Sequence, residues 1–172
     1  MKQDFSIELL VLEVDGVLTD GRAWPDARGE WRRRFSVRDS LALRSLRRSG
    51  ARIAILTRSR SADVASHAAL VGIDDCIQDC DDKPGALRAL IGRHGIEASR
   101  AAAIIECQGD AWMSEELGCV IATQSANEAV RRAAFYVTQA EGGDGAVREA
   151  CNVLRQGWET LLSASLAVTR SL

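Results

Sequence analysis

The sequence predicts an α/β fold in which a mostly parallel sheet is covered by helices on both faces. Short apolar runs alternate with segments of helical periodicity along most of the 172 residues, and this alternation is typical of strand–helix–strand units. The strand-like runs are apolar throughout, as expected for strands that are buried on both faces. Acidic residues and glycine turns follow several of these runs. Together these observations indicate a Rossmann-like, doubly wound parallel sheet.

The strands of the central sheet are predicted from apolar runs that end in polar or turn residues. The first run, 9–14, reads Leu-Leu-Val-Leu-Glu-Val and leads into Asp15 and a turn at Gly16. The other predicted strands span 52–56, 76–78, 101–105, 119–122 and 135–137.

Helices are predicted between these strands from periodic leucines and from start and stop signals. Ser61 can cap one helix, Pro84 lies in the first turn of another, and Gly50 and Gly118 can each end one. The predicted helices span 40–48, 61–70, 83–93, 110–117, 127–133 and 146–162.

A protruding β-hairpin is predicted at 22–37, between the first strand and the first helix. Its arms flank the turn sequence Pro-Asp-Ala-Arg-Gly at 25–29. The hairpin carries Trp24, Trp31 and the arginine run 32–34, which are residue types enriched at protein interfaces. We therefore expect it to be an oligomerisation element, the alternative being a solvent-exposed ribbon.

Length and composition predict one domain, 1–172, with a short C-terminal tail at 163–172. The formal net charge of −2 does not favour a nucleic-acid partner, even with the arginine run in the hairpin. No apolar run is long enough to span a membrane, and no signal peptide is expected. Five scattered cysteines are typical of reduced thiols in a cytoplasmic protein.

Polar side chains follow three of the predicted strands. The carboxyl ends of parallel strands meet at one edge of a sheet, so these side chains are expected to lie close together. Carboxylates at such an edge suit Mg²⁺, and a hydroxyl and a lysine beside them suit a phosphoryl group. The alternative is that each acid only caps a helix or solvates a loop. The residues are Glu13 and Asp15 after the first strand, Thr57 and Arg58 after the second, Glu106, Cys107 and Asp110 after the third, and Lys83 at a helix start.

Three stretches of the chain resemble one enzyme family. The segment 10–21, Leu-Val-Leu-Glu-Val-Asp-Gly-Val-Leu-Thr-Asp-Gly, is similar to the first motif of the haloacid dehalogenase superfamily of phosphatases. The stretches 34–39 and 142–149 are similar to the capless subgroup of 3-deoxy-manno-octulosonate-8-phosphate phosphatases. The resemblance covers about 9–154. It implies a hairpin in place of a cap domain and a homotetramer assembled through 22–37.

The resemblance also implies roles for the residues at the sheet edge. Glu13 matches the aspartate that attacks phosphorus, and Asp15 matches the acid that protonates the leaving group and then activates water. Thr57 and Lys83 match the catalytic phosphate-binding residues, and Thr57, Arg58 and Lys83 are the residues expected to bind phosphate or substrate. The implied metal ligands are Glu13, Asp15, Glu106 and Asp110, with Mg²⁺ as the cofactor if one is bound.

The departures from the family pattern cluster in this site. Glutamate replaces aspartate at Glu13 and Glu106, Cys107 replaces an acid, and Arg58-Ser59 replaces a Gly-Arg pair. Ile105 replaces a glycine, and Asp144 stands at an arginine-like position. One extra methylene moves a carboxylate by roughly 1–1.5 Å, and a misplacement of ~1 Å can cost ~10²-fold in rate.

These departures predict weak or absent phosphatase activity and a role as a binding or assembly module in sugar-acid metabolism. The alternative is an active Mg²⁺-dependent sugar-phosphate phosphatase that works through an acyl-phosphate on Glu13. The predicted partners are copies of the same chain and a sugar phosphate or another small anion, with no nucleic acid and no membrane.

Overall fold

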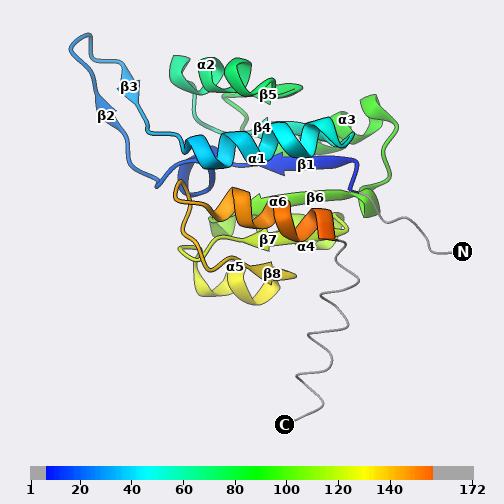
Figure 1. Ribbon diagram of the computed structural model, residues 1–172. Helices are drawn as coiled ribbons and strands as arrows, with labels where there is room; N and C mark the ends of the chain where they lie inside the picture. Colours follow the sequence, from blue (N-terminus) through cyan, green and yellow to red (C-terminus); the bar gives the residue numbers. More distant parts are fainter. Residues whose placement is uncertain (1–6, 157–172) are drawn as a thin grey trace, which may run out of the picture.

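The computed structural model contains a six-stranded parallel sheet with the strand order β5-β4-β1-β6-β7-β8. The structure describes residues 7–156. The sheet confirms the predicted Rossmann-like doubly wound architecture (Figure 1). Its strands are β1 (Leu9–Leu12), β4 (Arg52–Leu56), β5 (Asp75–Ile77), β6 (Ala101–Ile105), β7 (Cys119–Ala122) and β8 (Tyr136–Val137).

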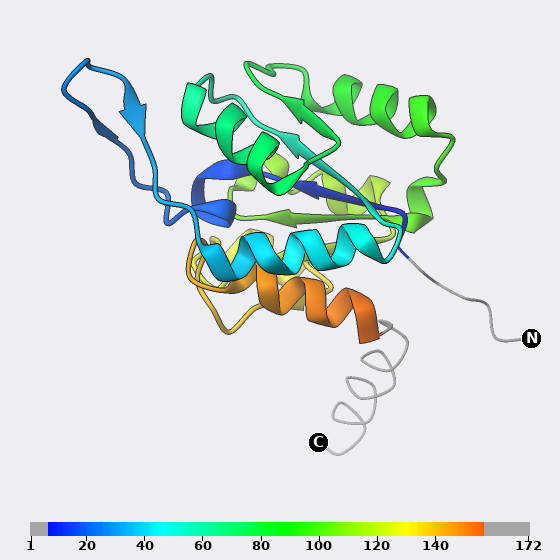
Figure 2. The same ribbon diagram turned by 45° about the horizontal axis from the view of Figure 1, so that its top comes forward.

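Helices cover both faces of this sheet, as Figures 1 and 2 show. Helices α1, α2 and α6 contribute to the core on one face, and α3, α4 and α5 contribute to the core on the other. The helices are α1 (Val37–Arg48), α2 (Ala62–Val71), α3 (Lys83–His94), α4 (Met113–Glu116), α5 (Glu128–Ala133) and α6 (Ala146–Gln156).

The central strand β1 shows why the apolar runs are continuous. Leu10 and Leu12 pack in one core layer, and Leu9 and Val11 pack in the other. Successive side chains of a strand point to opposite faces, so a strand with helices on both sides needs apolar residues at every position.

The strand order places a topological switch point between β1 and β6. The chain leaves β1 through α1 on one face and leaves β6 through α4 on the other. Connections that part in this way open a crevice at the carboxyl ends of the two strands, where ligands bind in open α/β sheets. Glu13 and Glu106 each follow one of these two strands directly.

A two-stranded antiparallel hairpin projects from the carboxyl edge of the sheet (Figures 1 and 2). Its strands, β2 (Trp24–Pro25) and β3 (Trp31–Arg32), are shorter than the predicted arms. The second arm was predicted to run to Val37, but that residue already begins α1. The helix starts early because the Ser36 hydroxyl accepts a hydrogen bond from the Asp39 backbone N–H at 3.4 Å.

Two other predicted elements differ from the structure by more than one residue at an end. Strand β1 ends at Leu12, and Val14–Leu18 forms a tight helical turn instead of continuing the strand. The predicted helix 110–117 is divided into a 3₁₀ turn, Gln108–Asp110, and α4. The last helix is described as far as Gln156, so its predicted end and the predicted tail 163–172 lie outside the described residues.

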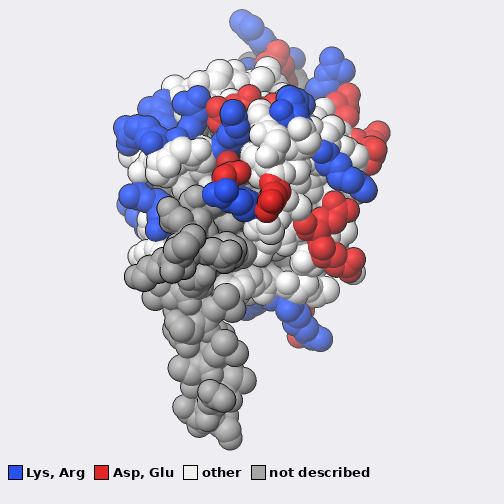
Figure 3. All heavy atoms as spheres, turned by 90° about the vertical axis from the view of Figure 1, so that its right-hand side faces the viewer, with Lys and Arg blue, Asp and Glu red and all other residues white. Residues whose placement is uncertain are grey.

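The amino edge of the sheet faces away from the hairpin and carries charges of both signs (Figure 3). A hollow of about 340 Å³ is lined there by Arg47, Arg48, Arg52 and Asp74, at the end of α1 and the start of β4. Within residues 7–156, no helix is long and apolar enough to cross a bilayer. The cytoplasmic location stays a prediction.

Helices α1 and α6 are joined by a buried carboxylate. Asp39 is 1% exposed, and its two oxygens accept hydrogen bonds from the backbone N–H groups of Gly145 (3.2 Å) and Arg148 (2.8 Å). These N–H groups lie at the start of α6, where a helix has no internal acceptors for them. A side chain in α1 therefore caps a helix more than a hundred residues away.

We predict that Asp39→Ala lowers the free energy of unfolding by about 1–3 kcal/mol, because two buried N–H groups lose their acceptor. Urea denaturation would measure the change. The neighbouring exposed residue gives a control, since Arg38→Ala should shift the value by only about 0.5 kcal/mol. Equal effects of the two substitutions would contradict the capping role of Asp39.

Candidate active site

Glu13 lies at the point where the central strand meets its turn. The residue has extended backbone angles (φ −77°, ψ 165°), and its Oε1 accepts a hydrogen bond from the Val14 N–H at 3.1 Å. The side chain is 12% exposed. Its carboxylate is thus held at the end of the strand by the first N–H of the following turn.

The turn Val14–Leu18 is held in place by the loop before α6. Gly143 N–H donates to the Val17 carbonyl at 3.0 Å. A Cβ on Gly142 would lie 1.9 Å from the Gly16 carbonyl oxygen, so only glycine allows this approach of the two backbones. The stretch 142–149, which resembles the phosphatase subgroup in sequence, therefore supports the segment that carries Glu13 and Asp15.

Lys83 connects the ends of β1 and β6. It is the first residue of α3, which is capped by the Asp82 side chain on Gly85 N–H (2.9 Å). Lys83 is 2% exposed. Its Nζ donates to the Glu13 Oε2 and to both oxygens of Asp110, at 3.0 and 2.8 Å. Two carboxylates from different strands thus share one buried ammonium group.

Asp110 is fully buried in the loop after β6. The 3₁₀ turn Gln108–Asp110 directs its carboxylate toward Lys83, and the Cys107 thiol lies 3.8 Å from the Asp110 Oδ2. Asp110 therefore acts as a partner of Lys83, with both of its oxygens engaged.

Asp15 is held by an arginine from the hairpin. Arg33 Nε donates to Asp15 Oδ1 at 2.6 Å, and its Nη2 donates to Asp15 Oδ2 at 3.2 Å. The Ser59 hydroxyl donates to the same Oδ2 at 3.0 Å. Burial raises the pKa of Asp15, but the Arg33 and Ser59 hydrogen bonds outweigh burial and hold it below its usual value.

The loop after β4 places its two predicted phosphate ligands differently. Thr57 is buried at the strand end, and its Oγ1 accepts a hydrogen bond from the Ser59 N–H at 3.1 Å. Arg58 is exposed and extends to the loop after β6, with Nη1 3.5 Å from the position that a Cβ on Gly109 would occupy. Arg58 thus points toward that loop, whereas its neighbour Ser59 contacts Asp15.

Glu106 lies against the turn after β1. Its Cγ is 2.7 Å from the position that a Cβ on Gly16 would occupy, so the absence of a side chain there makes room for it. Partial burial raises the pKa of Glu106. Among residues 7–156 no hydrogen-bond donor or cation contacts its carboxylate.

The four predicted metal ligands are not gathered around one point. Within the described residues, no group of three or more acidic, histidine or cysteine side chains is arranged to hold a metal ion. Asp15 is bound to Arg33, and Glu13 and Asp110 are both bound to Lys83. Glu106 borders the turn that follows Glu13 and has no cation partner among the described residues. Mg²⁺ in phosphoryl-transfer sites often takes only one or two carboxylates plus phosphate oxygens and water. Of the four, Glu106 is the carboxylate without a partner among the described residues, and it borders the turn that follows Glu13.

Arg33, Ser59 and Asp63 also belong to the site, although they are not among the residues predicted for it from the sequence. Arg33 was assigned to the hairpin interface, and nothing in its local sequence shows that it reaches a carboxylate 18 residues earlier. The available signal was the run of three arginines next to the predicted sheet edge.

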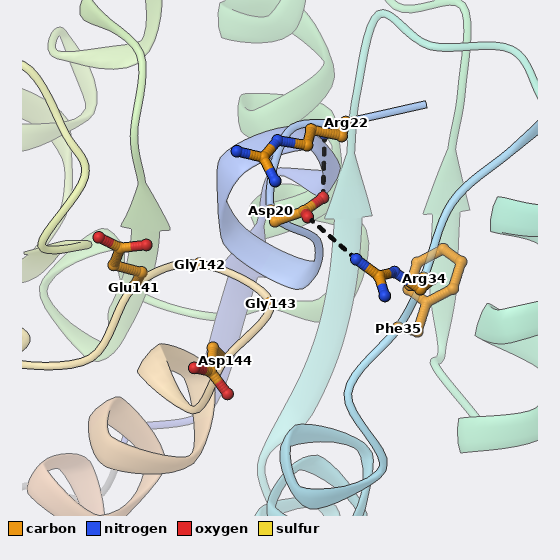
Figure 4. A pocket seen from close by; sticks show the side chains of 8 residues that line it. All are labelled: Asp20, Arg22, Arg34, Phe35, Glu141, Gly142, Gly143 and Asp144. Atoms are coloured by element: carbon orange, nitrogen blue, oxygen red, sulfur yellow. Dashed lines mark hydrogen bonds and ion pairs between the residues drawn. The ribbon is translucent and has the colours of Figure 1, made fainter. Parts of the chain in front are cut away.

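A cavity of about 460 Å³ opens beside the turn (Figure 4). Arg22 and Arg34 come from the hairpin, and Glu141 and Asp144 come from the loop before α6. Asp20 accepts a hydrogen bond from the Arg22 N–H at 3.0 Å and lies 3.8 Å from the Arg34 guanidinium. The cavity thus presents both basic and acidic groups.

Comparison with known proteins identifies the family. No protein-family model matches the chain. The 3-deoxy-D-manno-octulosonate 8-phosphate phosphatase KdsC of Escherichia coli K12 is 34% identical over 149 residues, which cover 87% of this chain and 79% of the relative. The chain belongs to the KdsC-like phosphatases of the haloacid dehalogenase superfamily. The predicted resemblance is thereby confirmed.

Solved structures of KdsC-like proteins have the same fold. The Moraxella catarrhalis phosphatase, in complex with a magnesium ion, a phosphate ion and a KDO molecule, matches with a TM-score of 0.84 and 35% identity, covering 92% of each chain. The cobalt-bound Haemophilus influenzae phosphatase matches with a TM-score of 0.84 and 30% identity, covering 88% of this chain and 89% of that one. Two KdsC-like proteins of the same fold thus carry a divalent metal ion in their structures.

We predict that Lys83→Met lowers the free energy of unfolding by about 3–5 kcal/mol, because Glu13 and Asp110 would remain buried without a cation. Chemical denaturation would measure the loss. Arg88→Met on the same helix is the matched control. Its guanidinium is 61% exposed and lies 3.7 Å from Glu116, so we expect a change of at most about 1 kcal/mol. Similar losses for the two variants would rule out a strong buried ion cluster.

Proposed function

We propose that this KdsC-like protein hydrolyses the phosphomonoester of a small sugar acid, with Glu13 as the nucleophile. The observation that carries the proposal is the placement of the Glu13 carboxylate at the end of the central strand by Val14 N–H and Lys83 Nζ. A fixed carboxylate beside a cation is the arrangement that nucleophilic attack on a phosphoryl group requires. The similarity to KdsC supports the same chemistry.

The reaction divides into two steps. In the first, a Glu13 oxygen attacks phosphorus, the bond from phosphorus to the leaving oxygen breaks, and Asp15 gives that oxygen a proton. In the second, water attacks the phosphorus of the acyl-phosphate, Asp15 takes the proton from the water, and Glu13 is released with phosphate. Thr57 and Lys83 bind phosphate oxygens in both steps.

Mg²⁺ is the proposed cofactor, held by Glu13 and Glu106. When bound, it would neutralise charge between the phosphate and the carboxylates. Binding would also compensate the Glu106 carboxylate, which has no cation partner within the described residues. Magnesium and cobalt in the two related structures support this part of the proposal.

The leaving group is proposed to occupy the cavity beside the turn. Its basic wall, Arg22 and Arg34, suits a carboxylate, and its acidic wall, Glu141 and Asp144, can accept hydrogen bonds from hydroxyls. A phosphorylated sugar acid carries both kinds of group. The Moraxella structure, which contains a KDO molecule, supports this class of substrate.

A second candidate function is binding of such a ligand without turnover. Two observations favour it. Glu13 and Glu106 are each one methylene longer than the aspartate that the family motif has at the same position. The extra methylene moves their carboxylate oxygens by roughly 1–1.5 Å. Arg33 also favours the ionised form of Asp15 through two hydrogen bonds, and this opposes proton donation to a leaving group.

We predict slow but measurable turnover that depends on Glu13. With Mg²⁺ and either p-nitrophenyl phosphate or a panel of sugar phosphates, wild-type protein should release phosphate, and Glu13→Ala should reduce release to background. Glu115→Ala removes an exposed carboxylate on α4 and should leave the rate unchanged. Equal phosphate release by wild type and Glu13→Ala would favour the binding function. The triple variant Glu13→Asp, Glu106→Asp, Cys107→Asp would then test whether the fold can still support hydrolysis.

We further propose that the chain forms a homotetramer through the hairpin 22–37. Its two tryptophans, Trp24 and Trp31, are 42% and 56% exposed. Large exposed aromatic side chains next to arginines are typical of interface cores.

The tetramer is expected to dissociate in the variant Trp24→Ser/Trp31→Ser, as measured by sedimentation velocity or native mass spectrometry. Truncation of buried aromatic anchors commonly costs ≥ ~2 kcal/mol of binding free energy per residue. Leu70→Ser, which changes an exposed apolar residue on α2 (67% exposed), is the matched control and should leave the assembly intact. A wild-type monomer, or a double variant that remains tetrameric, would exclude the hairpin as the assembly element.

A further inference from the structure

The guanidinium of Arg33 is buried although it belongs to a projecting hairpin. Its side chain is 8% exposed. Removing a charged group from water is costly unless other groups compensate for it. Here Asp15, Ser59 and Asp63 surround the guanidinium, and these three residues come from three different segments of the domain. The hairpin therefore delivers one specific side chain into the site.

The base of the hairpin is anchored so that Arg33 keeps this position. Phe35 stacks on His67 of α2, with ring centroids 3.9 Å apart and an interplanar angle of 10°. The Ser61 hydroxyl donates to the Trp31 carbonyl at 3.3 Å. Contacts on both sides of Arg33 thus fix the chain against the start of α2.

Arg33 lies next to the proposed phosphate position. Its Nη2 donates to the Ser59 hydroxyl at 2.9 Å, and the Ser59 N–H bonds to Thr57 Oγ1 at 3.1 Å. Ser59 therefore links the Arg33 guanidinium to the Thr57 hydroxyl through hydrogen bonds. The guanidinium also contacts Asp15 directly. Arg58, the arginine predicted to bind phosphate, extends instead toward Gly109.

The hydrogen bonds of Arg33 leave it a donor for a ligand. A guanidinium has five N–H donors. Nε and Nη2 provide three hydrogen bonds, and Nη1 has a single contact, 3.5 Å to Asp63 Oδ1. One Nη1 hydrogen thus has no acceptor within the described residues. Arginine suits phosphate because its planar fork can bind two oxygens at once.

Asp63 offers Arg33 a second position. Its Oδ2 is buried and has no hydrogen-bond partner among residues 7–156. A rotation of the guanidinium toward this oxygen would exchange its two hydrogen bonds to Asp15 for one to Asp63 and would release Asp15. Asp15 would then be available to the leaving group while Arg33 faces the phosphate.

We propose that Arg33 is the second phosphate-binding cation of this site, beside Lys83, and that Asp63 positions it. This inference rests on the proposed function, because it assumes that the site at the ends of β1 and β4 takes a phosphate group. It assigns to the hairpin a direct part in ligand binding, apart from any part in assembly.

The test is the affinity for inorganic phosphate, measured by isothermal titration calorimetry on the full chain with Mg²⁺. Arg33→Met is expected to weaken phosphate binding about 10- to 100-fold, the usual effect of losing a charge-assisted hydrogen bond. Arg33→Lys should give an intermediate affinity, since an ammonium keeps the charge but not the fork. Arg28→Met, an exposed arginine at the hairpin turn, should match wild type within twofold.

The outcomes separate this inference from the proposed function. Wild-type phosphate binding that falls in both Arg33 variants supports the inference, even if no substrate is hydrolysed. Folded Arg33→Met and Arg33→Lys proteins that bind phosphate as wild type does would overturn it, as would a wild-type protein that binds no phosphate. If Arg33→Met does not fold, the Arg33→Lys affinity decides. Where turnover is detectable, we expect Arg33→Lys to raise KM more than it lowers kcat.

Discussion

The buried contact of Lys83 with Glu13 and Asp110 is the interaction on which the site depends. It joins the end of β1, the start of α3 and the loop after β6 through one ammonium group. Buried charges are costly unless they are paired, so none of the three residues can adopt another position cheaply. The contact therefore fixes where the nucleophile candidate lies before any ligand binds. Its three residues together keep one excess negative charge, to which Glu106 adds another that a bound cation can balance.

The contact with Lys83 shows how the fold accommodates the extra methylene of Glu13. A glutamate reaches farther than an aspartate from the same backbone position, and here its carboxylate contacts both Val14 N–H and Lys83. The longer side chain is therefore accommodated without loss of its cation. Glu106 is accommodated differently. It lies over Gly16, and any side chain at position 16 would clash with it. The two lengthened acids thus fit the fold, and what they change is the position of the oxygens relative to phosphorus and metal.

The sequence was sufficient for the sheet because burial on both faces leaves a continuous apolar run. It was also sufficient to place Glu13, Thr57, Lys83 and Asp110 at one edge, because parallel strands end together. It could not show that Arg33 contacts Asp15. That contact depends on the Ser36 cap of α1 and on the stacking of Phe35 on His67, and the stacking brings together segments distant in the chain. The early start of α1 was missed for a related reason, since the Ser36 cap begins a helix where the hairpin arm was predicted to run to Val37.

The hairpin combines exposed aromatic side chains with a buried basic one. Its outer part exposes Trp24 and Trp31, whereas its base places Arg33 against Asp15. Strand β3 ends at Arg32, one residue before Arg33. A displacement of the outer part of the hairpin would therefore reach Arg33 through only a few residues. Contacts that a neighbouring copy makes with the tryptophans would therefore restrict the motion of the guanidinium that borders the site. In such an arrangement assembly stabilises the binding geometry even though no residue of the neighbour needs to touch the ligand.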